Sequence, residues 1–179
     1  MMYLAHPRTA SISTSWALCN YLGFEKAIPG DHHSCLNDEK VARPFCDDER
    51  GEWTVCTTVR NHWDAAVSWR YKRRHNRTSG EPWDGPQWKE LFLTFHWIRG
   101  RKMYGLHADD ADVILRYETL ESDLNELLAQ FGMKLERLPR DNVTPGRNGR
   151  HYRQFFTEGG RDFIARRFRE EIERFGYSY

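Results

Sequence analysis

Residues 1–15 have the sequence MMYLAHPRTASISTS and predict a strand, a turn and a helix in direct succession. The apolar start, residues 1–5, is bounded by His6-Pro7 and is typical of a buried strand. The turn carries one cation and several hydroxyls, and the apolar pattern that follows predicts a helix over residues 11–22. This arrangement places backbone N–H groups around an anion. An ordinary capped turn has the same pattern, so both interpretations stay open at this point.

Length and composition predict a single domain over residues 1–179, large enough to bury a core. The chain has 27 Lys and Arg against 26 Asp and Glu, which argues against a nucleic-acid binder held by bulk charge. Four cysteines without CxxC spacing favour reduced thiols, and a strand that begins at residue 1 leaves no room for a signal peptide. With no apolar run of membrane-spanning length, we expect a cytoplasmic protein without a membrane partner. Nothing in the sequence indicates an oligomeric state.

Further strands and helices alternate along the rest of the chain. Strands are expected over residues 53–59 and 113–115, and helices over residues 62–75 and 87–102. Two further helices are expected, one from an N-cap at Ser122 to a stop at Gly132 and one that follows Thr157. The buried stripes of the last two helices are expected to be Leu120, Leu124, Leu127, Leu128 and Phe131, then Ile164, Phe168, Ile172 and Phe175, with Arg and Glu outward. This alternation predicts an α/β fold with a short parallel sheet covered on both faces.

A second polar motif, VRNHWDAAVS at residues 59–68, begins where the second predicted strand ends. Arg60 leaves the strand, and Ser68 lies two turns into the predicted helix. A loop arginine and a helix serine can converge on one phosphate, with the arginine as a bidentate fork. In the alternative interpretation Arg60 pairs with a carboxylate and Ser68 is a solvated helix residue.

Both motifs resemble those of the sulfotransferases that use 3′-phosphoadenosine 5′-phosphosulfate (PAPS). Residues 7–11 (PRTAS) resemble the family's P-[KR]-[TSA]-[GA]-[ST] motif, and residues 60–68 resemble its R-N-P-x-D-x-x-x-S run. LRYETL at residues 115–120 is similar to its R-Y-E-D-L segment, and residues 152–177 are similar to its closing helix and F-G-Y signature. The resemblance spans nearly the whole chain.

The resemblance implies a fold, a reaction and a set of site residues. The fold is the three-layer α/β/α, P-loop NTPase-like sulfotransferase fold. The reaction moves a sulfuryl group from PAPS to a hydroxyl or amine of a small-molecule, glycan or peptide acceptor, and leaves adenosine 3′,5′-bisphosphate (PAP). The implied contacts are Arg8, Thr9, Ala10, Ser11, Ile12 and Ser13 at the 5′-phosphosulfate, Arg60 and Ser68 at the 3′-phosphate, and a closing loop with Arg147, Gly149 and Arg150.

This chain departs from the family pattern in four places. Many relatives have Lys at Arg8 and Gly at Ala10, and Ile12 stands where Ser or Thr is common. Arg8 still supplies a permanent positive charge, but its guanidinium group is planar and wider than the ammonium group of a lysine. His62 replaces a proline, which we expect to affect only turn geometry. The closing loop around Arg150 has an equal alternative, an ordinary solvated loop.

The acceptor must lose a proton, so a base is expected near the sulfur, and the family takes it from a segment matching residues 29–34 (PGDHHS). We favour His33, with His32 close behind, because imidazole titrates near neutral pH. The carboxylate alternatives are Asp31 and Glu39. A metal site of His32, His33, Cys35 and Cys46 matches no standard zinc spacing, so no metal is expected.

Two other functions stay open. A P-loop kinase requires GxxxxGK[ST], and the first loop has neither the glycines nor the lysine. A non-catalytic nucleotide-binding adaptor that keeps the fold would bind PAP without turnover. A basic run, Arg70, Lys72, Arg73, Arg74 and Arg77, is either a solvated helix face or an attraction for an anionic acceptor.

Overall fold

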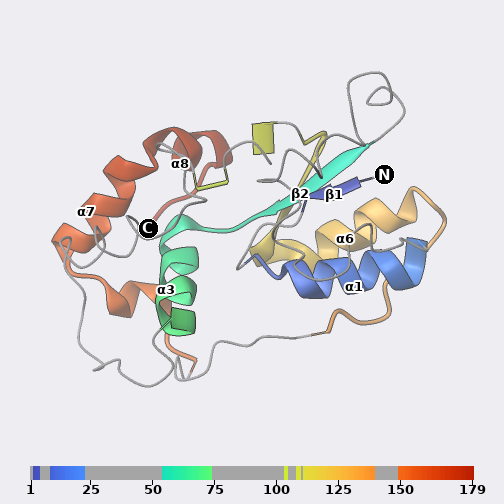
Figure 1. Cartoon of the computed structure of the whole chain (residues 1–179), viewed down its shortest axis with the longest axis horizontal. Helices are drawn as coiled ribbons and strands as arrows, with labels where there is room; N and C mark the ends of the chain where they lie inside the picture. The colour runs from blue at the N-terminus through green and yellow to red at the C-terminus, as the bar shows by residue number, and fades with distance from the viewer. Residues whose placement is uncertain are drawn as a thin grey trace. The chain divides into compact units, whose positions relative to one another are not determined.

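The computed structural model of the chain describes residues 2–4, 9–22, 54–73, 103–104, 108–109, 111–139 and 149–179 (Figure 1). The elements in these ranges are β1 (Met2–Leu4), α1 (Ser11–Leu22), β2 (Val55–Val59), α3 (His62–Arg73), β3 (Val113–Arg116), the 3-10 turn η3 (Tyr117–Thr119), α6 (Leu120–Ala129), the 3-10 turn η4 (Tyr152–Phe155), α7 (Glu158–Arg167) and α8 (Arg169–Phe175). The three predicted strands and the first two predicted helices are confirmed over their described residues, apart from Thr54, which precedes β2, and β3 extends one residue beyond its prediction, to Arg116. The helix predicted over residues 87–102 lies outside the described residues.

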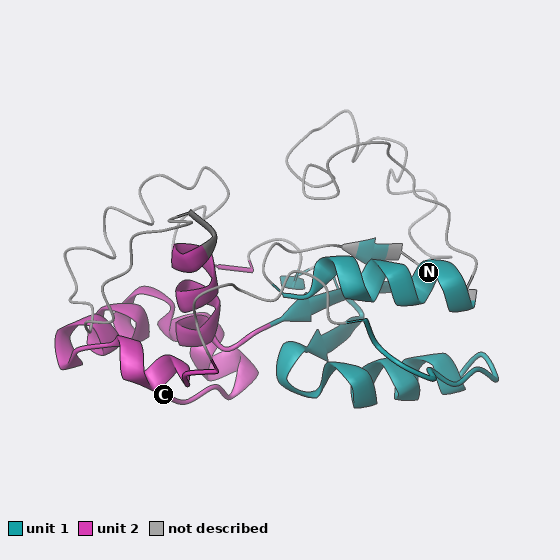
Figure 2. Ribbon diagram, turned by 90° about the horizontal axis from the view of Figure 1, so that it is seen from below, with its two compact units in different colours: residues 1–59, 106–142 teal, residues 60–105, 143–179 magenta. Residues whose placement is uncertain are grey.

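The chain divides into two compact units, which Figure 2 colours separately. Unit 1 comprises residues 1–59 and 106–142, and unit 2 comprises residues 60–105 and 143–179. The boundary at Val59 falls at the end of β2, so β2 belongs to unit 1 and Arg60 opens unit 2. The single domain expected over residues 1–179 stays a prediction.

Unit 1 is built on a parallel sheet with the strand order β1-β2-β3 among the described residues. The register pairs Tyr3 with Cys56 and Cys56 with Val113. The central strand β2 is buried along its whole length, as its β-branched sequence favours. The described chain is therefore a mixed α/β structure around a small parallel sheet, and this part of the fold prediction is confirmed.

The core of unit 1 joins the sheet to α1 and α6. Its buried residues are Ala17, Leu18, Cys56, Leu115, Leu120, Leu124, Leu127, Leu128 and Leu135. Phe131, expected in the buried stripe, is instead 48% exposed, because α6 ends before it and the chain turns away. Gly132 is confirmed as the stop: it has a φ of 70°, and the amide of Met133 reaches back to the carbonyl of Leu128 at 3.0 Å.

The start of α6 differs from the prediction that Ser122 caps it. The helix begins at Leu120, because η3 winds directly into it. Ser122 therefore lies in the first turn, where its hydroxyl donates to the carbonyl of Thr119 at 2.8 Å. The corner between β3 and α6 is closed by Asp123, whose Oδ2 accepts a hydrogen bond from the amide of Arg116 at 2.7 Å.

Unit 2 contains α3, η4 and the two C-terminal helices. The helix expected after Thr157 is present as α7, and the Thr157 hydroxyl caps it by accepting from the amide of Gly160 at 3.2 Å. The single last helix of the prediction is two helices, because the backbone of Phe168 leaves the helical range at φ −119° and ψ 28°. Glu171 is also not outward: it is 3% exposed and accepts hydrogen bonds inside the unit. Within the described ranges, no helix combines the length and apolar character needed to cross a membrane.

Candidate functional site

The first loop is described from Thr9 onward, and Arg8 lies outside the described residues. Ala10 has a φ of 59°, the one positive value at a non-glycine residue in the described ranges. This left-handed conformation is unfavourable for a residue with a Cβ atom and marks local strain. The carbonyl of Ala10 accepts from both the amide and the hydroxyl of Thr14, at 2.9 and 3.1 Å. Ala10 thus sets the sharp entry into α1.

Buried hydroxyls surround this loop within unit 1. The side chains of Thr9, Ser11, Ser13 and Thr14 are buried, and Ile12 is half-buried. The Tyr3 hydroxyl lies 3.0 Å from Oγ1 of Thr58, close to the carboxyl ends of β1 and β2. Burial raises the pKa of Tyr3 to about 12, although hydrogen bonds with threonine hydroxyls act to lower it. The predicted 5′ residues that are described therefore share one hydroxyl-rich region at this end of the strands.

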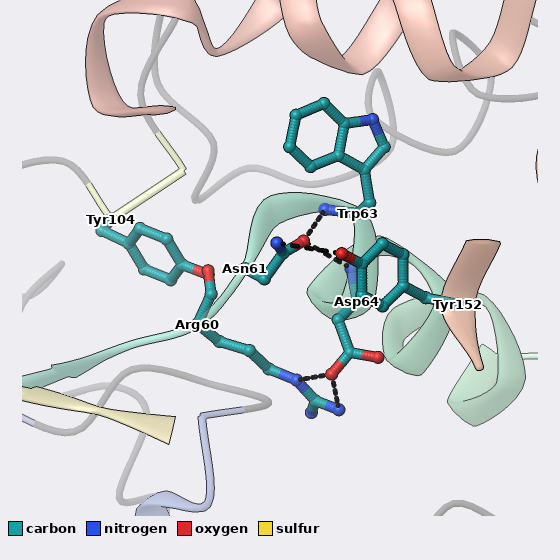
Figure 3. Close-up of polar contacts among 6 residues, drawn as sticks. All are labelled: Arg60, Asn61, Trp63, Asp64, Tyr104 and Tyr152. Atoms are coloured by element: carbon teal, nitrogen blue, oxygen red, sulfur yellow. Dashed lines mark hydrogen bonds and ion pairs between the residues drawn. The ribbon is translucent and has the colours of Figure 1, made fainter. Parts of the chain in front are cut away.

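The second motif opens unit 2, where Arg60 pairs with Asp64 (Figure 3). Nε and Nη2 of Arg60 both contact Oδ2 of Asp64, at 2.7 and 2.6 Å. Both residues are buried. The carboxylate pairing is the one that the alternative interpretation of Arg60 expected, and it leaves a phosphate role open because a guanidinium has five N–H donors.

Ser68 lies on the same face of α3 as Asp64. Positions 64, 68 and 71 are spaced i, i+4 and i+7, so Asp64, Ser68 and Tyr71 form a row along the helix. Ser68 is 0% exposed. The interpretation of Ser68 as a solvated helix residue is therefore wrong.

Arg150 contacts this row from the segment just before η4. Its Nη2 donates to the Tyr71 hydroxyl at 3.3 Å, and its guanidinium carbon lies 4.3 Å from the ring centroid of Phe155. The rings of Tyr71 and Phe155 meet edge to face, 5.5 Å apart. Gly149 has a φ of 72°, a value that glycine adopts readily. Arg150 is thus a partly buried residue held on α3, whereas Arg147 lies outside the described residues.

The turn at Arg60-Asn61 is fixed through its backbone as well (Figure 3). Oδ1 of Asn61 accepts from the amides of Trp63 and Asp64, at 3.1 and 3.3 Å, and so caps α3. Nδ2 of Asn61 donates to the carbonyl of Ser178 at 3.0 Å. The Tyr104 hydroxyl donates to the carbonyl of Arg60, and burial raises its pKa well above the ordinary value. Contacts from distant parts of unit 2 therefore converge on this turn.

The buried His62–Glu171 pair contacts Tyr104 through a hydrogen bond to its amide and through ring packing. Nε2 of His62 donates to Glu171 at 3.0 Å, and the amides of Met103 and Tyr104 donate to the same carboxylate at 2.5 and 2.8 Å. Burial acts to raise the pKa of Glu171, but the His62 and backbone hydrogen bonds outweigh it and hold the pKa below its ordinary value. The expectation that His62 affects only turn geometry is wrong, because its ring is a buried hydrogen-bond donor and packs 5.1 Å from the Tyr104 ring.

Several other predicted site residues lie where the structure gives no description. The candidate bases His32 and His33, with Asp31 and Glu39, lie outside the described residues, as do the cysteines of the metal alternative. In the part of the chain that the structure describes, no group of three or more His, Cys, Asp or Glu residues could hold a metal ion. Arg70 is 7% exposed, so this member of the basic run does not belong to a solvated face.

Sequence reasoning gave no role to Asp64, Tyr104 or Glu171. The i,i+4 spacing of Arg60 and Asp64 is a usable signal for their ion pair. No local pattern could have joined Glu171 to Tyr104, since 67 residues separate them. Comparison with protein-family models, with curated proteins and with solved structures found no match.

Proposed function

We propose that this chain is a cytoplasmic PAPS-dependent sulfotransferase with the three-layer, P-loop NTPase-like sulfotransferase fold. It transfers a sulfuryl group to a hydroxyl or amine of a small-molecule, glycan or peptide acceptor. The observation that carries the proposal is the row on α3. Ser68 lies in it, Arg60 pairs with its Asp64 and Arg150 contacts its Tyr71, and the family resemblance assigns Arg60, Ser68 and Arg150 to the 3′-phosphate.

The chemistry of this row suits a phosphate. Two guanidinium groups and a hydroxyl supply charge-assisted and neutral donors, and arginine forks match the geometry of phosphate oxygens. The burial of Arg60 and Ser68 strengthens each contact, because the local dielectric constant is low. A 3′-phosphate distinguishes PAPS from ATP, and binding energy from this remote group can orient the reacting end.

The loop of unit 1 supports the same proposal from the 5′ end. PAPS supplies the sulfuryl group when it is bound. Thr9, Ser11 and Ser13 offer hydroxyl donors, and the strained turn at Ala10 begins α1, whose first amides are donors for an anion. Donors aimed at the sulfuryl oxygens stabilise developing charge. Arg8 is assigned the fixed positive charge, and His33 or His32 the acceptor's proton.

Calorimetry with two nucleotides tests the 3′-phosphate assignment. We expect PAP to bind the full chain in the presence of EDTA at least about tenfold more tightly than adenosine 5′-phosphate, as one charge-assisted contact predicts. Arg60→Ala and Ser68→Ala should reduce this preference. Arg169→Ala is the matched control, since Arg169 is an exposed arginine paired at i,i+4 with Glu173 in the same unit. Equal affinities of the wild-type protein for the two nucleotides would overturn the proposal.

Transfer of labelled sulfate from PAPS to a panel of hydroxyl and amine acceptors tests the activity itself. His33→Ala or His32→Ala should keep PAP affinity and abolish turnover in one case. PAP binding with no transfer to any acceptor class would instead favour a non-catalytic nucleotide-binding protein.

A further inference from the structure

We infer that Asp64 is a positioning residue that holds the Arg60 guanidinium in the orientation that meets the 3′-phosphate. The inference rests on the proposed function and adds a specificity determinant to it. It starts from the geometry of one ion pair inside unit 2 (Figure 3).

Asp64 engages a single edge of the guanidinium. Nε and Nη2 of Arg60 both point at Oδ2 of Asp64, at 2.7 and 2.6 Å. Because the guanidinium is planar, two contacts along this edge fix both its plane and the direction of its opposite Nη1 side. That side is directed away from Asp64, and it can present a second fork to an anion.

Asp64 is itself firmly placed. It stands in the first turn of α3, and its amide donates to Oδ1 of Asn61 at 3.3 Å. Its side chain is 11% exposed and that of Arg60 is 6% exposed, so water competes little for the pair. A long arginine side chain loses much rotamer freedom when it is ordered, and a partner that orders it before the ligand arrives improves affinity by preorganisation.

Positioning and plain electrostatics predict opposite results. A carboxylate close to a phosphate site repels the ligand, so removing its charge should tighten binding if charge alone mattered. If Asp64 orients Arg60, removing its charge should weaken the contact with the 3′-phosphate and leave the contacts with the rest of the nucleotide unchanged.

The experiment measures, by calorimetry, the ratio of affinities for PAP and for adenosine 5′-phosphate. For Asp64→Asn we expect this ratio to fall by about tenfold, within the range of coupling between contacting residues, with adenosine 5′-phosphate affinity unchanged. Glu173→Gln is the matched control: it removes the carboxylate of an exposed i,i+4 pair with Arg169 at 2.8 Å and should leave the ratio unchanged. Asp64→Glu keeps the ion pair for folding but shifts its geometry, so its ratio should lie between those of the wild type and Asp64→Asn.

A double-mutant cycle separates positioning from other roles. In an Arg60→Ala background Asp64→Asn should no longer change the ratio, because Asp64 acts through Arg60. An unchanged or larger ratio in Asp64→Asn, or an equal loss in the Arg60→Ala background, overturns the inference and leaves the proposed function standing. A wild-type protein without preference for PAP overturns the proposed function first, and the inference with it.

Discussion

The family resemblance assigns the turn at Thr9–Ser13 in unit 1 to the 5′ end of PAPS and the turn at Arg60-Asn61 in unit 2 to its 3′-phosphate, yet the two turns are held in different ways. The first is local: the carbonyl of Ala10 is tied to Thr14 four residues on, and the surrounding groups are hydroxyls. The second contains a buried ion pair, and besides its local contacts it is held by Tyr104 and Ser178, far along the chain. A strained local backbone forms the first turn, whereas the second turn combines a local ion pair, Arg60–Asp64, with contacts that only tertiary structure supplies.

The largest effect on stability is expected from removing the carboxylate of Glu171, which binds the amide of Tyr104, a residue that contacts the Arg60-Asn61 turn. Glu171→Ala removes the acceptor of the His62 ring and of two backbone amides, so we expect a loss of about 3–5 kcal/mol in the free energy of unfolding. Denaturant titration measures it, with Glu170→Ala, an exposed neighbour, as the control. A loss no larger than that of Glu170→Ala would mean that the second turn does not depend on these distant contacts.

The same carboxylate predicts how stability depends on pH. The pKa of Glu171 is lowered in the folded state from an ordinary value of 4.5, so the folded protein holds the ionised form more strongly than the unfolded chain does. This contribution is complete above that ordinary value and is lost as the pH falls through the lower folded value. We expect stability measured by denaturation to decrease with acid more steeply in the wild type than in Glu171→Gln. Parallel curves for the two proteins would contradict the assignment.

Removing either of two helix N-caps in unit 2 should have an effect of intermediate size, and the two caps differ in their distance from Arg60. Asn61→Ala and Thr157→Ala each remove an N-cap, so each should cost about 1 kcal/mol in the free energy of unfolding. Only Asn61→Ala should also weaken PAP binding, because Asn61 adjoins Arg60. On the same samples, calorimetry measures the affinity for PAP and denaturation measures the free energy of unfolding. An equal loss of PAP affinity in both variants would show that general stability, rather than the Arg60 turn, controls binding.

The smallest effect is expected in the first turn. Ala10→Gly relieves the left-handed strain and should stabilise the protein by up to about 1 kcal/mol. Ala129→Gly, at the exposed end of α6, should destabilise it instead. Thermal unfolding of the two variants gives the signs. A destabilised Ala10→Gly would mean that the strain at Ala10 is not a property of the first turn in solution.

The parts that could be predicted from the sequence are the local ones. The apolar run before α1, the β-branched residues of β2 and the glycine after α6 predicted these elements and ends because each signal lies within one turn or strand. Ser122 has the residue type of a cap, but η3 winds into the helix before it. Phe131 fits the helical period, but the helix ends too early.

The candidate site divides in the same way. The two motifs predicted which residue types follow β1 and β2, and the i,i+4 spacing of Arg60 and Asp64 indicates their ion pair. Glu171 could not have been placed from the sequence, because a glutamate in an amphipathic helix is ordinarily exposed. Its burial depends on amide donors that come from residues 103–104, in another segment of the chain.

The bond between Asn61 and Ser178 has a consequence for the order in which the chain folds. It joins residues 117 positions apart, whereas the bonds from Thr14 to Ala10 close a single helical turn. Closing long loops is entropically costly and slows folding. During synthesis the first turn can form while α1 emerges from the ribosome, but the bond from Nδ2 of Asn61 to the carbonyl of Ser178 cannot form until Ser178 has been made. In refolding followed by pulsed hydrogen exchange, we expect the Thr14 amide to gain protection before the Tyr104 amide, which donates to Glu171, 67 residues away in unit 2.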